Sequence, residues 1–267
     1  MCGRFSIYLL AGAIIVALAA ISAVGEPFWD KRDWKEWNRE DCSRMLQNSP
    51  WAKKWAQSVV NLSSGSLPGR SGPATAGSAD EIRPEVDYFI QIRSALPIRE
   101  ADVRRIQLDK KYDHMDAEQK KVLDAEGEKI LEPTYDDVIL IHVDYGSNIV
   151  PYERALASYF QSIPDGSVPV GVYLINERGD HVGVAKWVST RSGDYEFEMY
   201  FPRNLKGEPV IHDSDKKFSI EFPAPAVGSQ MGTSSNARDT GTARLSKQLV
   251  LVEFTLSAMK WKGHVTF

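Results

Sequence analysis

The sequence predicts an α+β fold, with a mixed N-terminal strand and helix part followed by an antiparallel β-sandwich-like or sheet part. Capped segments with helical spacing occur only before about residue 165, between short apolar strands. Beyond that point, alternating apolar and polar residues recur with turn signals between them. We therefore divide the mature chain into an α+β part at 26–165 and an antiparallel β part at 166–267, and these parts can share one core.

The first 25 residues have the three regions of a cleavable signal peptide. Arg4 supplies the positive charge, an uncharged apolar run follows, and Ala23 and Gly25 occupy the small-residue positions before a cut near Glu26. The alternative is an uncleaved anchor, because about 20 apolar residues can span a bilayer. We expect an exported protein, periplasmic or secreted, that meets the membrane only through this segment if it stays uncleaved.

The composition excludes one class of partner. The chain has 32 basic and 36 acidic residues, a net charge of −4, which is not the basic footprint of a nucleic-acid-binding protein. Cys2 lies in the signal peptide, so Cys42 is the single cysteine of the mature chain and no intramolecular disulfide can form. We expect Cys42 to be a small buried side chain, with a reactive thiol as the alternative.

The helices and strands of the first part follow from local patterns. Asn38 predicts a helix start, with an acid three residues later and a stop at Ser49-Pro50. The next segment, 51–62, fits a helix or a strand, and the Gly/Ser/Pro-rich segment 63–79 is predicted to be flexible. Strands at 86–93 and 138–145 and helices at 98–111, 116–131 and 152–162 complete this part.

The second part contains only strand patterns. Two strands, 170–175 and 181–188, flank the turn 176–180 and predict a hairpin. Further strands are predicted at 195–201, 218–222 and 248–256, and the last of these leads to residues 261–267.

Two blocks of the chain resemble a group of uncharacterised exported bacterial proteins. The first contains Trp34-Lys35-Glu36-Trp37 and Ser49-Pro50-Trp51-Ala52, and the second is Ile92-Arg93-Ser94-Ala95-Leu96-Pro97. The resemblance implies that the segment after Ser49-Pro50 is a strand, paired across a variable loop with the strand before Ser94. It implies export and topology, and no activity or catalytic residue.

Two pairs of polar residues have the spacing of neighbours on one strand face. His142 and Asp144 can both bind a transition metal, but a further ligand is needed and the sequence does not identify one. Glu196 and Glu198 resemble the paired carboxylates of glycoside hydrolysis. A polar end to a buried strand explains the first pair, and a strand with one solvent-exposed face fully explains the second. We therefore predict no catalytic residue, no metal ligand and no cofactor.

The start of the mature chain is rich in tryptophan. Exposed tryptophan rings are platforms for sugars and for partner proteins, so Trp34, Trp37, Trp51 and Trp55 are the candidate binding residues. The alternative is that this segment docks its apolar side on the sheet.

The absence of a recognisable catalytic motif favours a non-enzymatic envelope or secreted protein that binds a protein or polymer partner. Two alternatives remain open. One is an exported hydrolase whose acidic and histidine residues, first His142, Asp144, Glu196 and Glu198, meet only in the fold. The other is binding of a polysaccharide through the tryptophan-rich segment.

Overall fold

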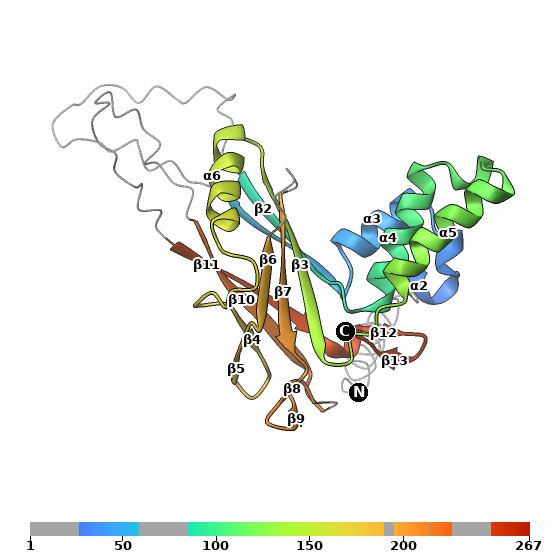
Figure 1. The fold of residues 1–267 in the computed structure, drawn as a ribbon. Helices are drawn as coiled ribbons and strands as arrows, with labels where there is room; N and C mark the ends of the chain where they lie inside the picture. The colour runs from blue at the N-terminus through green and yellow to red at the C-terminus, as the bar shows by residue number, and fades with distance from the viewer. Residues whose placement is uncertain (1–26, 59–84, 190–194, 213, 226–246) are drawn as a thin grey trace, which may run out of the picture.

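A computed structural model describes residues 27–58, 85–189, 195–212, 214–225 and 247–267 (Figure 1). The predicted signal peptide at 1–25 and the predicted flexible segment at 63–79 lie outside these residues. Among the described residues, no helix has both the length and the apolar character needed to cross a bilayer.

The fold belongs to the α+β class, as the sequence predicts, and its described strands all pair antiparallel. The helices are α2 (Phe28–Lys31), α3 (Arg39–Gln47), α4 (Leu96–Asp109), α5 (Ala117–Leu131) and α6 (Val150–Gln161). Short 3-10 turns are η1 (Trp34–Glu36), η2 (Tyr112–His114) and η4 (Leu256–Ala258).

The larger sheet has the strand order β1-β2-β3-β7-β6. Its strands are β1 (Ala52–Ser58), β2 (Glu85–Ile92), β3 (Val138–Ser147), β7 (Glu196–Pro202) and β6 (Lys186–Ser189). The segment after Ser49-Pro50 is thus a strand, and it pairs with the strand before Ser94, which confirms that expected pairing. Strands from both sides of residue 165 meet in this sheet, because β3 pairs with β7.

The smaller sheet has the order β11-β10-β4-β5. Its strands are β11 (Lys247–Thr255), β10 (Lys217–Pro225), β4 (Tyr173–Ile175) and β5 (His181–Gly183), and two short hairpins pair β8 (Asn204–Leu205) with β9 (Glu208–Pro209) and β12 (Lys260–Trp261) with β13 (His264–Val265). The hairpin around 176–180 is confirmed. However, the predicted strand 181–188 is divided, because β5 pairs within this sheet whereas β6 crosses to the larger one.

Aromatic side chains between the two sheets form the centre of the core. Phe222 of β10 lies 5.7 Å from Tyr88 of β2 and 5.5 Å from Phe197 of β7, measured between ring centroids. Phe160 of α6 lies 4.6 Å from Phe197 and closes one end of this core. One face of the larger sheet is therefore apolar, and strand alternation sends the polar residues of β3 and β7 to the opposite, outer face.

Helices α3, α4 and α5 form an arm beside the two sheets, called the helical arm below (Figure 1). The predicted caps are confirmed: Asn38 and Asp41 form a capping box for α3, and Asp116 and Gln119 form one for α5. Helices α4 and α5 approach closely at Gly127, where an added Cβ would lie 2.9 Å from a methyl group of Val103.

Cys42 of α3 is fully buried, in agreement with the expected small buried side chain. Burial, with a further contribution from Asp41, raises the pKa of its thiol to about 11, although Arg104 lowers it. Since the thiolate is the reactive form, we expect Cys42 of a Cys2→Ser chain to react with an aromatic disulfide reagent at pH 8 only after denaturation. Rapid reaction of one thiol per folded chain would contradict the burial.

Candidate functional site

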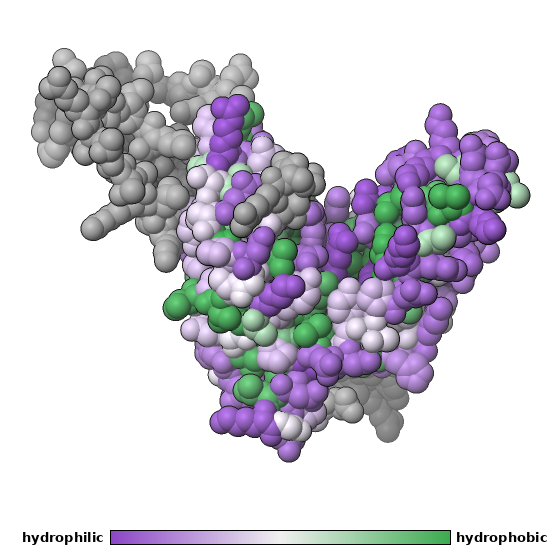
Figure 2. Space-filling model, viewed as in Figure 1, coloured by the Kyte–Doolittle hydropathy of each residue, from purple (hydrophilic) through white to green (hydrophobic). Residues whose placement is uncertain are grey.

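The outer face of the larger sheet looks towards the helical arm. Figure 2 shows that the molecule is hollowed between the sheet and this arm, and that hydrophilic residues gather in the hollow. Two side-chain ties hold the arm in place: Gln91 of β2 donates a hydrogen bond of 2.9 Å to the carbonyl oxygen of Leu46 in α3, and Arg93 pairs with Asp102 of α4 at 2.9 Å. These contacts fix the position of the helical arm relative to the sheet, and so they fix the shape of the hollow.

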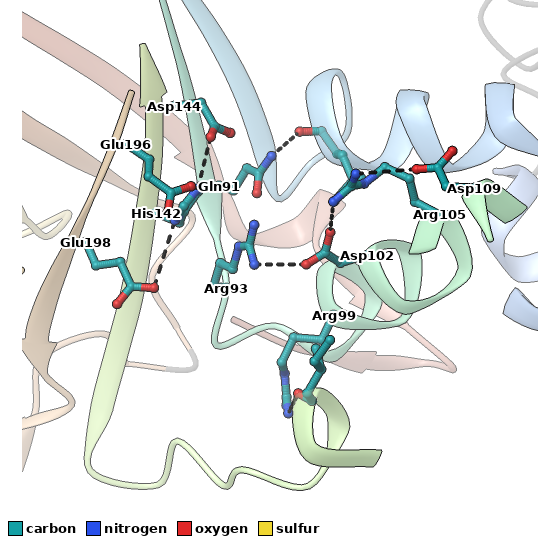
Figure 3. A network of polar contacts seen from close by, with 12 residues as sticks. Gln91, Arg93, Arg99, Asp102, Arg105, Asp109, His142, Asp144, Glu196 and Glu198 are labelled. Atoms are coloured by element: carbon teal, nitrogen blue, oxygen red, sulfur yellow. Dashed lines mark hydrogen bonds and ion pairs between the residues drawn. The ribbon is translucent and has the colours of Figure 1, made fainter. Parts of the chain in front are cut away.

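The pairing of β3 with β7 decides which polar side chains meet in the hollow. The register sets His142 opposite Glu198 and Asp144 opposite Glu196. Since alternate residues of a strand share a face, and directly opposed residues of antiparallel strands are neighbours, all four side chains gather on the outer face (Figure 3).

The imidazole of His142 lies among three carboxylates. Its Nε2 is 3.2 Å from Asp144 Oδ1 and 3.5 Å from Glu196 Oε2. Its Nδ1 is 3.9 Å from Glu198 Oε1, which is within ion-pair range but beyond hydrogen-bond distance. Tyr200 donates a hydrogen bond of 2.6 Å to the other oxygen of Glu198. Both nitrogens of the ring thus face carboxylates.

Burial and charge act in opposite directions on the imidazole. The side chain of His142 is 4% exposed, whereas those of Asp144 and Glu196 are 43% and 30% exposed. Burial lowers the pKa of His142, and Arg93 lowers it further, but the carboxylates of Asp144 and Glu198 outweigh both and raise it above its ordinary value. The buried ring of His142 therefore holds the neighbouring carboxylates in position, and the carboxylates are the groups that reach solvent.

Two arginines lie beside this cluster, Arg93 in the turn between β2 and α4 and Arg105 on α4 of the helical arm. Arg93 and Arg105 share Asp102, at 2.9 and 2.6 Å (Figure 3). Burial lowers the pKa of Arg105, but Asp102, Asp109 and Asp144 outweigh it and raise the pKa above its ordinary value. The site therefore combines carboxylates on the sheet with cations beside them.

The sequence identified the four residues of the sheet as two pairs, and it offered their meeting in the fold only as an alternative hypothesis. The structure brings the pairs together, because β3 and β7 are neighbours in the sheet although 48 residues or more separate them in the chain. Arg93, Asp102, Arg105 and Tyr200 were missed. Tyr200 continues the outward alternation of Glu196 and Glu198, so that pattern could have identified it. Nothing local marks the others.

The candidate tryptophan residues do not lie in the hollow. Trp37 and Trp51 are fully buried, Trp34 is 9% exposed and Trp55 is half-buried. Trp37 packs on Trp261 with ring centroids 5.8 Å apart, so the N-terminal segment covers the C-terminal one. The interpretation as an exposed binding platform does not agree with the burial of three of these four rings, which favours the docking alternative.

A cavity of about 510 Å³ lies elsewhere, between the start of α4, the end of α5 and the C-terminal residues. It contains two arginines, but both already have several acceptors. Arg99 donates to the carbonyl oxygens of Leu131 and Pro133, and Arg203 donates to that of Tyr135. Arg99 ties the start of α4 to the end of α5, Arg203 ties the residue after β7 to the segment before β3, and the hollow remains the stronger candidate.

The chemistry available in the hollow follows from its side chains. The imidazole and carboxylates are ligands for a cation, and a solvent-exposed carboxylate can accept a proton from water. The arginines can orient an anionic group. No family model, curated protein or solved structure gives a significant match to this chain.

Proposed function

We propose that this chain is an exported hydrolase that acts on anionic esters in the hollow between the larger sheet and the helical arm. The observation that supports the proposal is the convergence of His142, Asp144, Glu196 and Glu198 on one face, beside Arg93 and Arg105. The export part of the proposal rests on the N-terminal signal pattern and on the resemblance to exported proteins.

Each group has a role in the proposed reaction. The partly exposed carboxylates of Asp144 and Glu196 hold a water molecule and accept its proton, while the buried His142 fixes their position through Nε2. The water oxygen bonds to the electrophilic phosphorus or carbonyl carbon, the bond to the leaving oxygen breaks, and that oxygen takes up the proton. Arg93 and Arg105, which are 25% and 49% exposed, orient the anionic group.

The test is turnover of a panel of phosphoesters and carboxylate-bearing esters by the wild-type chain and by Asp144→Asn. We expect kcat/KM to fall at least tenfold in the variant, because the amide cannot accept the proton, a loss of about 1.4 kcal/mol or more in transition-state stabilisation. Glu253→Gln is the matched control, since Glu253 is an exposed carboxylate paired with Lys217 on the other sheet.

Equal turnover by Asp144→Asn and the wild type would reject the hollow as the catalytic site. Binding of panel compounds without turnover would reject hydrolysis and leave the non-enzymatic alternative, in which the same hollow receives a partner.

A further inference from the structure

We infer that His142, Asp144 and Glu196 form a binding site for one divalent first-row transition metal ion on the outer face of the larger sheet. One donor atom from each of these three side chains lies within 4.8 Å of the other two. Metal binding is a property of the folded chain itself, whereas a catalytic role for the bound ion rests on the proposed function.

The spacing of the donors agrees with the size of such an ion. A metal with ligand bonds of about 2.0–2.2 Å keeps neighbouring donors roughly 3.0–3.5 Å apart. The Nε2 atom of His142 lies 3.2 Å from Asp144 Oδ1 and 3.5 Å from Glu196 Oε2. A carboxylate oxygen of Asp144 and one of Glu196 lie within 4.8 Å of each other, and these two oxygens move closer together to complete the site.

The far side of the imidazole supplies an independent observation. Residue His142 is 3% exposed, and its Nδ1 has no hydrogen-bond partner among the residues that the structure describes. This nitrogen faces Glu198, 3.9 Å away, whose other oxygen is held by Tyr200. Metal-binding histidines almost always donate the second ring N–H to a carboxylate or carbonyl, which leaves the first nitrogen unprotonated. Glu198 is placed for this role, so Nε2 is the nitrogen presented to the ion.

The exposure of the two carboxylates leaves a coordination position of the ion open to a water molecule or a substrate. The carboxylates of Asp144 and Glu196 are 43% and 30% exposed, so the site opens to the hollow. Three protein ligands and an open position are the arrangement of catalytic metal sites. The metal ligands stand on two directly paired strands, so the backbone register holds their spacing.

The donor set also indicates the type of metal. One imidazole nitrogen with two carboxylates suits Zn²⁺, Mn²⁺ or Fe²⁺, whereas Mg²⁺ and Ca²⁺ prefer oxygen ligands throughout. An ion in this position would polarise the attacking water and lower its pKa. Asp144 and Glu196 would then hold that water in place by binding the ion.

The test is calorimetric titration of the chelator-treated, dialysed protein with ZnCl₂ and with MnCl₂, the latter also followed by the electron paramagnetic resonance signal of free Mn²⁺. We expect about one ion per chain. The double variant Asp144→Asn/Glu196→Gln should bind at least 100-fold more weakly, because it keeps only one of three ligands. Glu198→Gln should bind roughly 10–100-fold more weakly with the same stoichiometry, because it alters only the orienting group.

Glu253→Gln is again the matched control and should bind as the wild type does. The substituted carboxylates are partly exposed, so circular dichroism and thermal unfolding should show a folded double variant. If the wild type binds neither ion more tightly than the folded double variant, the inference is overturned.

The same proteins separate this inference from the proposed function. Metal binding without turnover of any ester would support the metal site and reject the hydrolase. Turnover that is sensitive to Asp144→Asn but unchanged by chelation would support the hydrolase and reject the metal site.

Discussion

Replacing Phe197 by alanine is expected to lower the free energy of unfolding by about 3–5 kcal/mol, the usual cost of removing a buried phenylalanine ring. Phe197 is fully buried on β7. Its ring stacks on Trp187 of β6 at 4.2 Å and contacts Phe160 of α6 at 4.6 Å. It also meets Phe222 of the other sheet at 5.5 Å, so the variant leaves a cavity where both sheets and α6 join. Equilibrium unfolding in urea measures the change.

Two further variants make this result interpretable. Phe197→Leu should lose less than Phe197→Ala, because it keeps most of the buried volume. Val170→Ala should change stability by no more than about 0.5 kcal/mol, since Val170 is 89% exposed. A loss below about 1 kcal/mol for Phe197→Ala would show that the two sheets do not share this core.

Stability should also depend on pH through Glu100 of α4. This residue is 4% exposed, and within the described part of the chain its Oε2 has no hydrogen-bond partner. Burial, with a contribution from Asp33, raises its pKa from 4.5 to about 7, while Lys262 and Arg99 oppose the rise. The folded chain therefore holds this proton more tightly than the unfolded chain does. The stabilisation is complete below about pH 4.5 and is lost as the pH rises through 7.

The expected size of this effect is about 3 kcal/mol, from a pKa difference of roughly 2.5 units at 1.36 kcal/mol each. The measurement compares unfolding free energies of wild type and Glu100→Gln between about pH 4 and pH 8. The glutamine cannot ionise, so the variant should gain stability relative to the wild type as the pH rises. A difference that stays constant across this range would show that Glu100 titrates normally in the folded chain.

Local patterns predicted most of the helices and strands, because their causes lie within a few residues. The capping pairs at Asn38 and Asp116 supply hydrogen bonds to the first turns of α3 and α5, whatever the rest of the chain does. Alternation at 195–201 predicted β7 in the same way. The predicted strand 181–188 failed as one element, because its crossing between two sheets depends on partners far away in the chain.

The candidate site could be predicted only in fragments. Periodicity placed His142 with Asp144 and Glu196 with Glu198, but a single alternating strand gives no information about its neighbour in the sheet. The arginines were beyond prediction for the same reason, since their approach depends on how the helical arm lies against the sheet. The tryptophan residues were proposed as a binding surface, but three of the four are buried. Composition alone does not distinguish an exposed ring from a buried one.

By itself, the sequence determined the α+β class, most of the strands and helices, and the face of each strand that carries apolar side chains. These properties follow from backbone and side-chain preferences over short distances. Only the tertiary structure decided that β3 lies beside β7, that the N-terminal tryptophans are mainly core, and that a histidine and three carboxylates meet in one hollow. Strand order and register depend on contacts between distant segments that must bury their apolar faces together, and no single segment records its partner.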